Sequence, residues 1–169
     1  MAISFNRFVV TQAIVIAAFN AGMNASYTWW LWRSRDTLPL GGPGNIGIDL
    51  ATTPTVIAVL STLLGTVAIR QKLRAGHVAV PATTLPAALY ASPYGLLQRT
   101  IVFGTVAAAT LSLPLWAALQ ASGIDTLSLT DAILAKVLIT IVMSLLIIPV
   151  TILAALADVQ QRRGVAVPA

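Results

Sequence analysis

Polar side chains recur at helical spacing within the last apolar segment of the chain, where they could contact an ion or a polar solute. Lys136, Thr140 and Ser144 are four residues apart, which places them on one face of an α-helix. Thr151 and Asp158 continue this polar row toward the C-terminus. A cation near the centre of a membrane helix costs about 2.5–3.5 kcal/mol on insertion scales, so its ammonium should face protein, water or the membrane interface.

Asp49 is the expected counter-ion of Lys136, and Asp131 is the alternative on the same segment as the lysine. One interpretation is functional, with Lys136 in contact with a substrate or an ion. The other is structural, because the lysine could form a simple ion pair or extend its long stem to the headgroups. A further interpretation is catalytic: an intramembrane enzyme would use Asp49 with Lys136 as its base.

Other polar residues lie on the two earlier apolar segments, at the depth expected for Lys136. Asn20 and Asn24 are one helical turn apart, and their amides are expected to bond to neighbouring helices, with ligand contact as the alternative. Thr52 could instead return its hydrogen bond to a carbonyl of its own helix. The predicted cluster for binding a solute or ion comprises Lys136, Asp49, Asn20, Asn24, Thr52, Thr140 and Ser144.

Several kinds of chemistry lack the residues that they need. The chain has no Cys and one His, and its five acidic residues are all Asp. Thiol catalysis, thiolate metal sites and haem held between two histidines are therefore excluded. The glycine-rich segment 41–47 lacks the Lys of a phosphate-binding loop. We accordingly expect no cofactor and no metal ion, and we assign no catalytic residue.

The elements that must position the polar cluster are membrane helices. Hydrophobic residues make up 57% of the 169 residues and charged residues 9%, an apolar excess that a soluble domain of this size could not bury. Four stretches reach the length of about 20 residues that a membrane helix needs, namely 8–30, 50–69, 100–120 and 132–157. We predict an all-α integral membrane protein whose residues 1–169 form one transmembrane domain, a four-transmembrane-helix bundle of two αα-hairpins.

The positions of the cations predict the orientation of these helices. Most of the ten lie before the first span, between the second and third, or after the fourth, and only Arg33 and Arg35 fall in the loops on the opposite side. By the positive-inside rule, both termini and the loop 70–99 are cytoplasmic. This proline-broken loop is expected to lie along the membrane surface.

The net charge of +5 is therefore an orientation signal, and nucleic acid is not an expected partner. The expected surroundings are the lipid bilayer of a cell membrane, of the bacterial inner-membrane type, with the chain crossing it several times.

Small residues at four-residue spacing predict which helix faces pack together, since close approach drives helix association in lipid. Two such rows are present. They are Ala18, Gly22 and Ser26 on the first span, and Gly104, Ala108 and Ser112 on the third.

Pro114 and Pro149, inside the third and fourth spans, are expected to kink their helices. Segments 56–64 and 138–146 resemble each other faintly. Either the two hairpins are duplicates with the same orientation, or two apolar segments are alike by composition; the sequence leaves both open.

Two classes of function fit these observations. The first is non-enzymatic binding, transport or conduction of a small solute or lipid at the polar cluster, by an oligomer, since four short helices rarely enclose a path alone. The second is an accessory or assembly subunit of a larger membrane complex, whose polar rows are contacts between helices. The intramembrane enzyme is the third.

Overall fold

The computed structural model describes residues 4–78, 85–90 and 95–162. The elements in order are α1 (Phe5–Trp32), β1 (Thr37–Pro39), α2 (Ile46–Arg74), α3 (Ala87–Tyr90), α4 (Leu96–Ala107), the π-helical turn η1 (Ala108–Ser112), α5 (Leu113–Ala121), β2 (Thr126–Ser128) and α6 (Leu129–Arg162). Helices account for most of the described chain, and two three-residue strands lie in the segments between α1 and α2 and between α5 and α6.

Within the described residues, four helices are long and apolar enough to cross a membrane, which confirms the number predicted from the sequence. They are α1, α2, the continuous stretch α4–η1–α5 and α6. Each extends beyond the apolar stretch expected for it, because helical hydrogen bonding continues past the last apolar residue into polar flanking turns.

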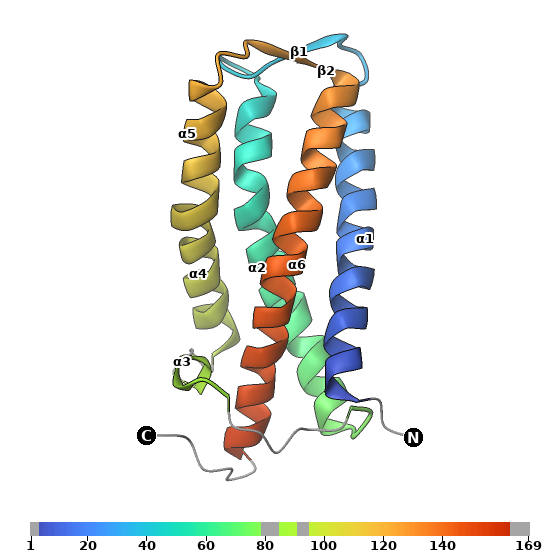
Figure 1. The fold of residues 1–169 in the computed structure, drawn as a ribbon, viewed down its shortest axis with the longest axis vertical. Coiled ribbons are helices and arrows are strands. Elements are labelled where there is room, and N and C mark those ends of the chain that lie inside the picture. The colour runs from blue at the N-terminus through green and yellow to red at the C-terminus, as the bar shows by residue number, and fades with distance from the viewer. Residues whose placement is uncertain (1–3, 79–84, 91–94, 163–169) are drawn as a thin grey trace.

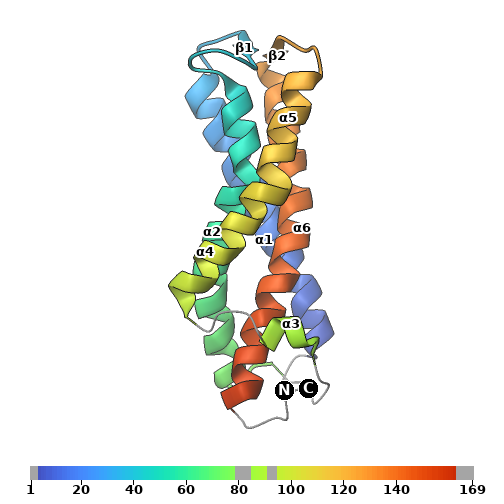
Figure 2. The same cartoon turned by 90° about the vertical axis from the view of Figure 1, so that its left-hand side faces the viewer.

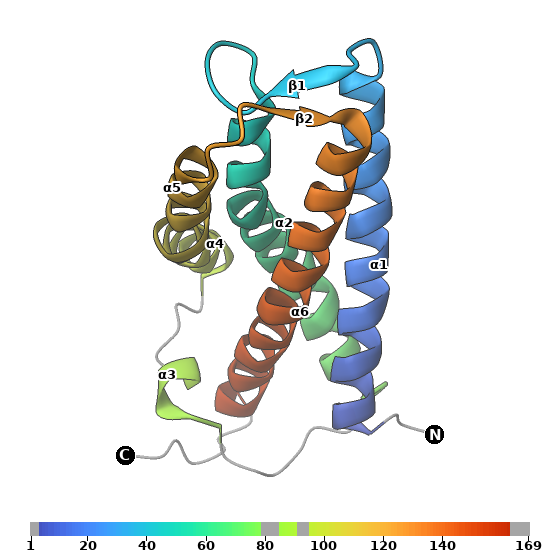
Figure 3. The ribbon, with the colours of Figure 1, turned by 45° about the horizontal axis from the view of Figure 1, so that its top comes forward.

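The helices form an all-α bundle with α2 and α6 at its centre (Figure 1). The two central helices pack on each other, α1 packs along α6, and α4 with η1 and α5 packs along α2. The start of α1 and the end of α6 lie at one end of the bundle, here called the terminal end (Figures 1 and 2). The two strands lie at the other end, here called the ribbon end (Figure 3).

The β-ribbon was not predicted. β1 and β2 pair antiparallel with Leu38 opposite Leu127, where the sequence indicated only irregular loops. Leu38 is fully buried and joins a small hydrophobic core with Leu40, Ile46 and Leu50. The ribbon thus closes this end of the bundle over apolar side chains.

The order helix, strand, helix occurs twice, in α1–β1–α2 and in α4–α5–β2–α6, and the two strands pair with each other (Figure 3). The central helices even start alike. The Asn45 side chain accepts a hydrogen bond from the Ile48 amide, and the Ser128 hydroxyl accepts one from the Asp131 amide. The halves therefore share an arrangement of elements, as the duplication hypothesis requires; their common origin remains a prediction.

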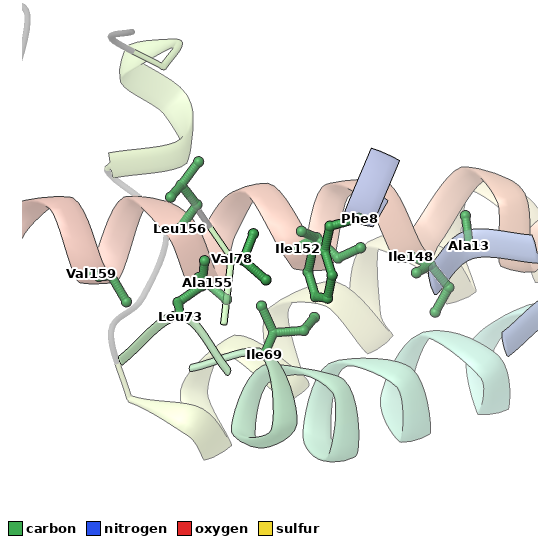
Figure 4. Close-up of a cluster of buried hydrophobic side chains, with 10 residues drawn as sticks. All are labelled: Phe8, Ala13, Ile69, Leu73, Val78, Ile148, Ile152, Ala155, Leu156 and Val159. Atoms are coloured by element: carbon green, nitrogen blue, oxygen red, sulfur yellow. The ribbon is translucent and has the colours of Figure 1, made fainter. Parts of the chain in front are cut away.

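The larger hydrophobic core lies toward the terminal end, between α1, α2 and α6 (Figure 4). Phe8 from α1 meets Ile69 and Leu73 from α2 and Ile148 and Ile152 from α6, and all five are buried. Because three helices contribute to it, this core joins α1, α2 and α6 near the terminal end.

One predicted packing face is not buried within the single chain. Ala18, Gly22 and Ser26 on α1 are exposed, and the helix instead buries a row of small residues one position earlier. That row comprises Ala13, Ala17 and Ala21. α1 is apolar on nearly all sides, so the periodicity of its small residues could not distinguish the two rows.

The small residues of the third span behave as predicted. Gly104 is buried against Val59 of α2, and a Cβ atom there would come within 2.8 Å of the Val59 Cγ2 atom. Ser112 is buried and forms a hydrogen bond of 2.9 Å with Thr55 of α2.

The two prolines differ in their surroundings. Pro114 is the second residue of α5, which follows η1, so the irregularity of the third span takes the form of a π-helical turn before the proline. α6 continues as one helix through Pro149. The predicted loop 70–99 is shorter than expected, because α2 continues to Arg74 and α4 begins at Leu96; of the segment between them, 79–84 and 91–94 lie outside the described residues.

Candidate functional site

Lys136 forms a buried ion pair with Asp49, as the sequence predicted. The Lys136 Nζ atom lies 2.6 Å from Asp49 Oδ1 and 3.3 Å from the Asp49 backbone oxygen. The lysine side chain is 3% exposed, so it does not extend to solvent. Asp131, the alternative partner, is exposed and accepts a hydrogen bond of 2.7 Å from the Ser128 hydroxyl. The pair therefore connects α2 to α6.

A cavity of about 370 Å³ surrounds this ion pair and is here called the crevice. Its volume lies within the range of about 300–1,000 Å³ that is typical of small-molecule sites. Five of the seven predicted site residues line it, namely Lys136, Asp49, Asn20, Asn24 and Thr52.

The other two predicted residues belong to the same buried face of α6 but do not line the crevice. Ser144 accepts a hydrogen bond of 3.0 Å from the Asn20 amide and so orients this residue of the crevice. The Thr140 hydroxyl is buried and has no hydrogen-bond partner among the described residues.

The crevice opens sideways between α1 and α2, with α6 behind it. α1 and α2 both pack along α6, whereas few contacts join α1 to α2 directly. Apolar and aromatic side chains that face outward form its edges: Phe19, Met23 and Tyr27 on α1, and Val56 and Leu60 on α2. The crevice is therefore polar beside Lys136 and has apolar edges along its length, with Asn20 and Ser61 as polar residues of its lining at the far end.

Several polar side chains of the predicted site already form hydrogen bonds within the protein. Thr52 donates to the Ile48 carbonyl of its own helix, as expected for a membrane threonine. Asn20 bonds across to α6, which confirms the prediction of an interhelical bond. Asn24 was predicted to do the same, but its amide donates to the Asn20 carbonyl at 2.9 Å within α1. The Asn24 side chain lies one helical turn after Asn20 and therefore reaches that carbonyl.

A second buried ion cluster, near the terminal end, was not predicted. Asp158 accepts two hydrogen bonds from Arg99, of 2.8 and 2.6 Å, and one of 2.9 Å from Arg70. The Arg99 side chain is 0% exposed and that of Arg70 is 14% exposed. The cluster ties α2, α4 and α6 together by a bidentate pair, the strongest form of such contacts.

The sequence contained one signal for this cluster. Asp158 continues the polar row of α6 that Lys136 begins, and a carboxylate on a buried face needs a cationic partner. Arg70 and Arg99 were assigned only to the cytoplasmic loop. A neighbouring buried contact also joins two helices: the Tyr90 hydroxyl of α3 donates a hydrogen bond of 2.8 Å to Gln160 of α6.

The two ion clusters differ in what they can do. Asp158 has both oxygens engaged by arginines and serves to hold helices together. The Lys136–Asp49 pair borders a cavity instead, and Asp49 Oδ2 accepts no hydrogen bond from a described residue. The crevice can therefore offer hydrogen bonds to a bound molecule.

Comparison with protein-family models, with curated proteins and with solved structures yields no significant match. The interpretation of the crevice therefore rests on its geometry and chemistry.

Proposed function

We propose that this chain is a multi-pass membrane protein of a cell membrane, of the bacterial inner-membrane type, and that its terminal end faces the cytoplasm. Four long apolar helices support the insertion. The cations support the orientation, since four of them lie near the terminal end of the bundle: Arg70, Lys72 and Arg74 at the end of α2, and Arg99 at the start of α4. In this orientation the crevice opens into the outer leaflet.

We propose further that the crevice binds a lipid-like amphiphile, without catalysis. The observation that carries this proposal is the side opening of the crevice, which is polar at the level of Asp49 and has apolar edges down to Leu60. Eleven residues separate the two along α2, a distance of about 16 Å. One leaflet of the hydrocarbon core is about 15 Å thick. A headgroup beside Lys136 would thus leave its acyl chain along the crevice, reaching the bilayer centre.

The outward face of α1 favours an assembly of several chains, as an oligomer or with a partner in a membrane complex. Ala18, Gly22 and Ser26 form a smooth row on that face, and nothing in the described structure lies within 4 Å of a Cβ placed at Gly22. Small residues of this kind let a second helix approach closely in lipid. An accessory or assembly role is the second candidate function.

The lipid-binding proposal is tested by filling the crevice. A Val56→Trp variant places a large side chain at its edge, whereas Val67→Trp adds the same side chain to an exposed position of α2 outside it. Each protein is extracted in mild detergent, and the bound lipid is counted by native mass spectrometry. We expect Val56→Trp to lose a lipid that the wild type and Val67→Trp retain; equal retention by all three would contradict the proposal.

A further inference from the structure

The ion pair in the crevice has one donor and one acceptor left over. An ammonium has three N–H donors, and Lys136 directs bonds to two oxygens of Asp49. Asp49 Oδ2 accepts no hydrogen bond from a described residue. Oδ2 is buried, but the Asp49 side chain is 24% exposed and the terminal torsion of a carboxylate is soft, so rotation about that torsion is the movement that would turn Oδ2 toward the crevice.

The charge of the pair restricts which headgroup fits it. Lys136 and Asp49 together are neutral, so a purely anionic headgroup that approaches the lysine also meets the carboxylate. A headgroup with an anion and an N–H donor satisfies both members at once, because each of its charges faces an opposite charge. Such bonds are charge-assisted and are stronger than those between neutral groups.

The depth of the pair agrees with a phospholipid headgroup. Lys136 lies seven residues after the first residue of α6, about 10 Å from the ribbon end, and Asp49 lies in the first turn of α2. On α2 the apolar edge of the crevice lies farther from the ribbon end, since Val56 and Leu60 are seven and eleven residues after Asp49. The polar and apolar parts of the crevice therefore follow the order of headgroup and chain in a single leaflet.

We propose that the crevice selects a zwitterionic phospholipid with a primary ammonium, an ethanolamine phospholipid, whose phosphate bonds to Lys136 and whose ammonium bonds to Asp49. This inference rests on the proposed lipid-binding function. A choline headgroup carries the same charges but no N–H group, so it cannot donate to Asp49. Comparison of ethanolamine with choline lipids therefore isolates the hydrogen bond.

The test uses the full chain in vesicles of equal parts ethanolamine, choline and glycerol phospholipids with identical acyl chains. The protein is extracted gently, and the lipid retained by each molecule is identified by mass spectrometry. A hydrogen bond to a charged group contributes about 1.5–3 kcal/mol, so we expect about tenfold or greater enrichment of the ethanolamine over the choline lipid. Equal retention of these two, or a preference for the anionic glycerol lipid, would overturn the headgroup assignment.

Two variants connect the preference to the ion pair. Lys136→Met combined with Asp49→Asn removes both charges together, which avoids an uncompensated charge in the fold. We expect this double variant to lose the enrichment. Lys72→Met is the matched control, because Lys72 lies on α2 near the terminal end and contacts Gln12 there; enrichment that survives in the double variant would contradict the proposal.

The outcomes separate this inference from the function on which it rests. If ethanolamine and choline lipids are retained equally and Val56→Trp displaces both, the headgroup assignment is wrong and the lipid site stands. If the wild type retains no lipid of any kind, both proposals fail.

Discussion

The Asp158→Asn substitution tests whether the ion cluster near the terminal end holds three helices together. Asp158 is the shared partner of Arg99 and Arg70, and the Arg99 side chain is completely buried. Asparagine keeps the size of the side chain but removes the charge that compensates this arginine. Breaking a buried pair in this way costs about 3–5 kcal/mol, and we expect the free energy of unfolding to fall by that amount.

Removing Arg70 instead should cost less. Arg70 is partly exposed and can turn toward solvent, and in its absence Asp158 keeps both of its hydrogen bonds to Arg99. For Arg70→Gln we expect a loss of about 1.5–3 kcal/mol, the contribution of hydrogen bonds to a charged group. Replacing the buried pair together, with Arg99→Met and Asp158→Leu, should restore most of the stability, because neither buried charge then needs a partner.

Unfolding titrations in mixed micelles measure these differences, followed by the fluorescence of the four tryptophans. Asp131→Asn is the control, since Asp131 is exposed at the ribbon end and, among the described residues, its carboxylate accepts a hydrogen bond from Ser128, the last residue of β2. The control should lose about 1 kcal/mol or less. An Asp158→Asn protein as stable as the control would refute the view that the cluster carries the packing of α2, α4 and α6.

Two further predictions concern packing and orientation. Gly104→Leu should destabilise the bundle by about 1–3 kcal/mol, because even a Cβ atom there crowds Val59, whereas Gly22→Leu should leave the stability of the single chain unchanged; equal losses in unfolding titrations would contradict the packing described. The chain has no Cys, so single cysteines at Gly44 and His77 report orientation. We expect an impermeant maleimide to label Gly44→Cys from outside and His77→Cys only after the membrane is opened, and the reverse pattern would contradict the proposed topology.

Much of the candidate site could be predicted because its signals are local. The polar row of α6 follows from helical spacing, and a buried Lys136 needs a carboxylate, of which the sequence offers few at the right depth. Asn24 shows the limit of this reasoning. Its residue type indicates a hydrogen bond, but only the rotamer decides whether the partner lies on the same helix or on the next one.

The β-ribbon and the Arg99–Asp158 pair could not be predicted for a different reason. Strands of three residues are too short to show an alternating pattern, and they form here because two distant loops meet over Leu38. Arg99 and Asp158 are 59 positions apart, and their contact depends on how α4 and α6 are placed. Contacts between distant segments leave no periodicity in either one.

The sequence by itself determined the all-helical class and the number of long apolar helices, because apolar content and the spacing of apolar stretches can be read from the sequence. It also indicated that the Lys136 ammonium must face protein, water or the membrane interface, since an unpaired cation in an apolar setting is costly wherever the helix packs. Only the tertiary structure decided which side of α1 is buried and that a crevice opens between α1 and α2. An apolar helix can present any face to its neighbours, and the choice depends on the shapes of all the helices that it meets.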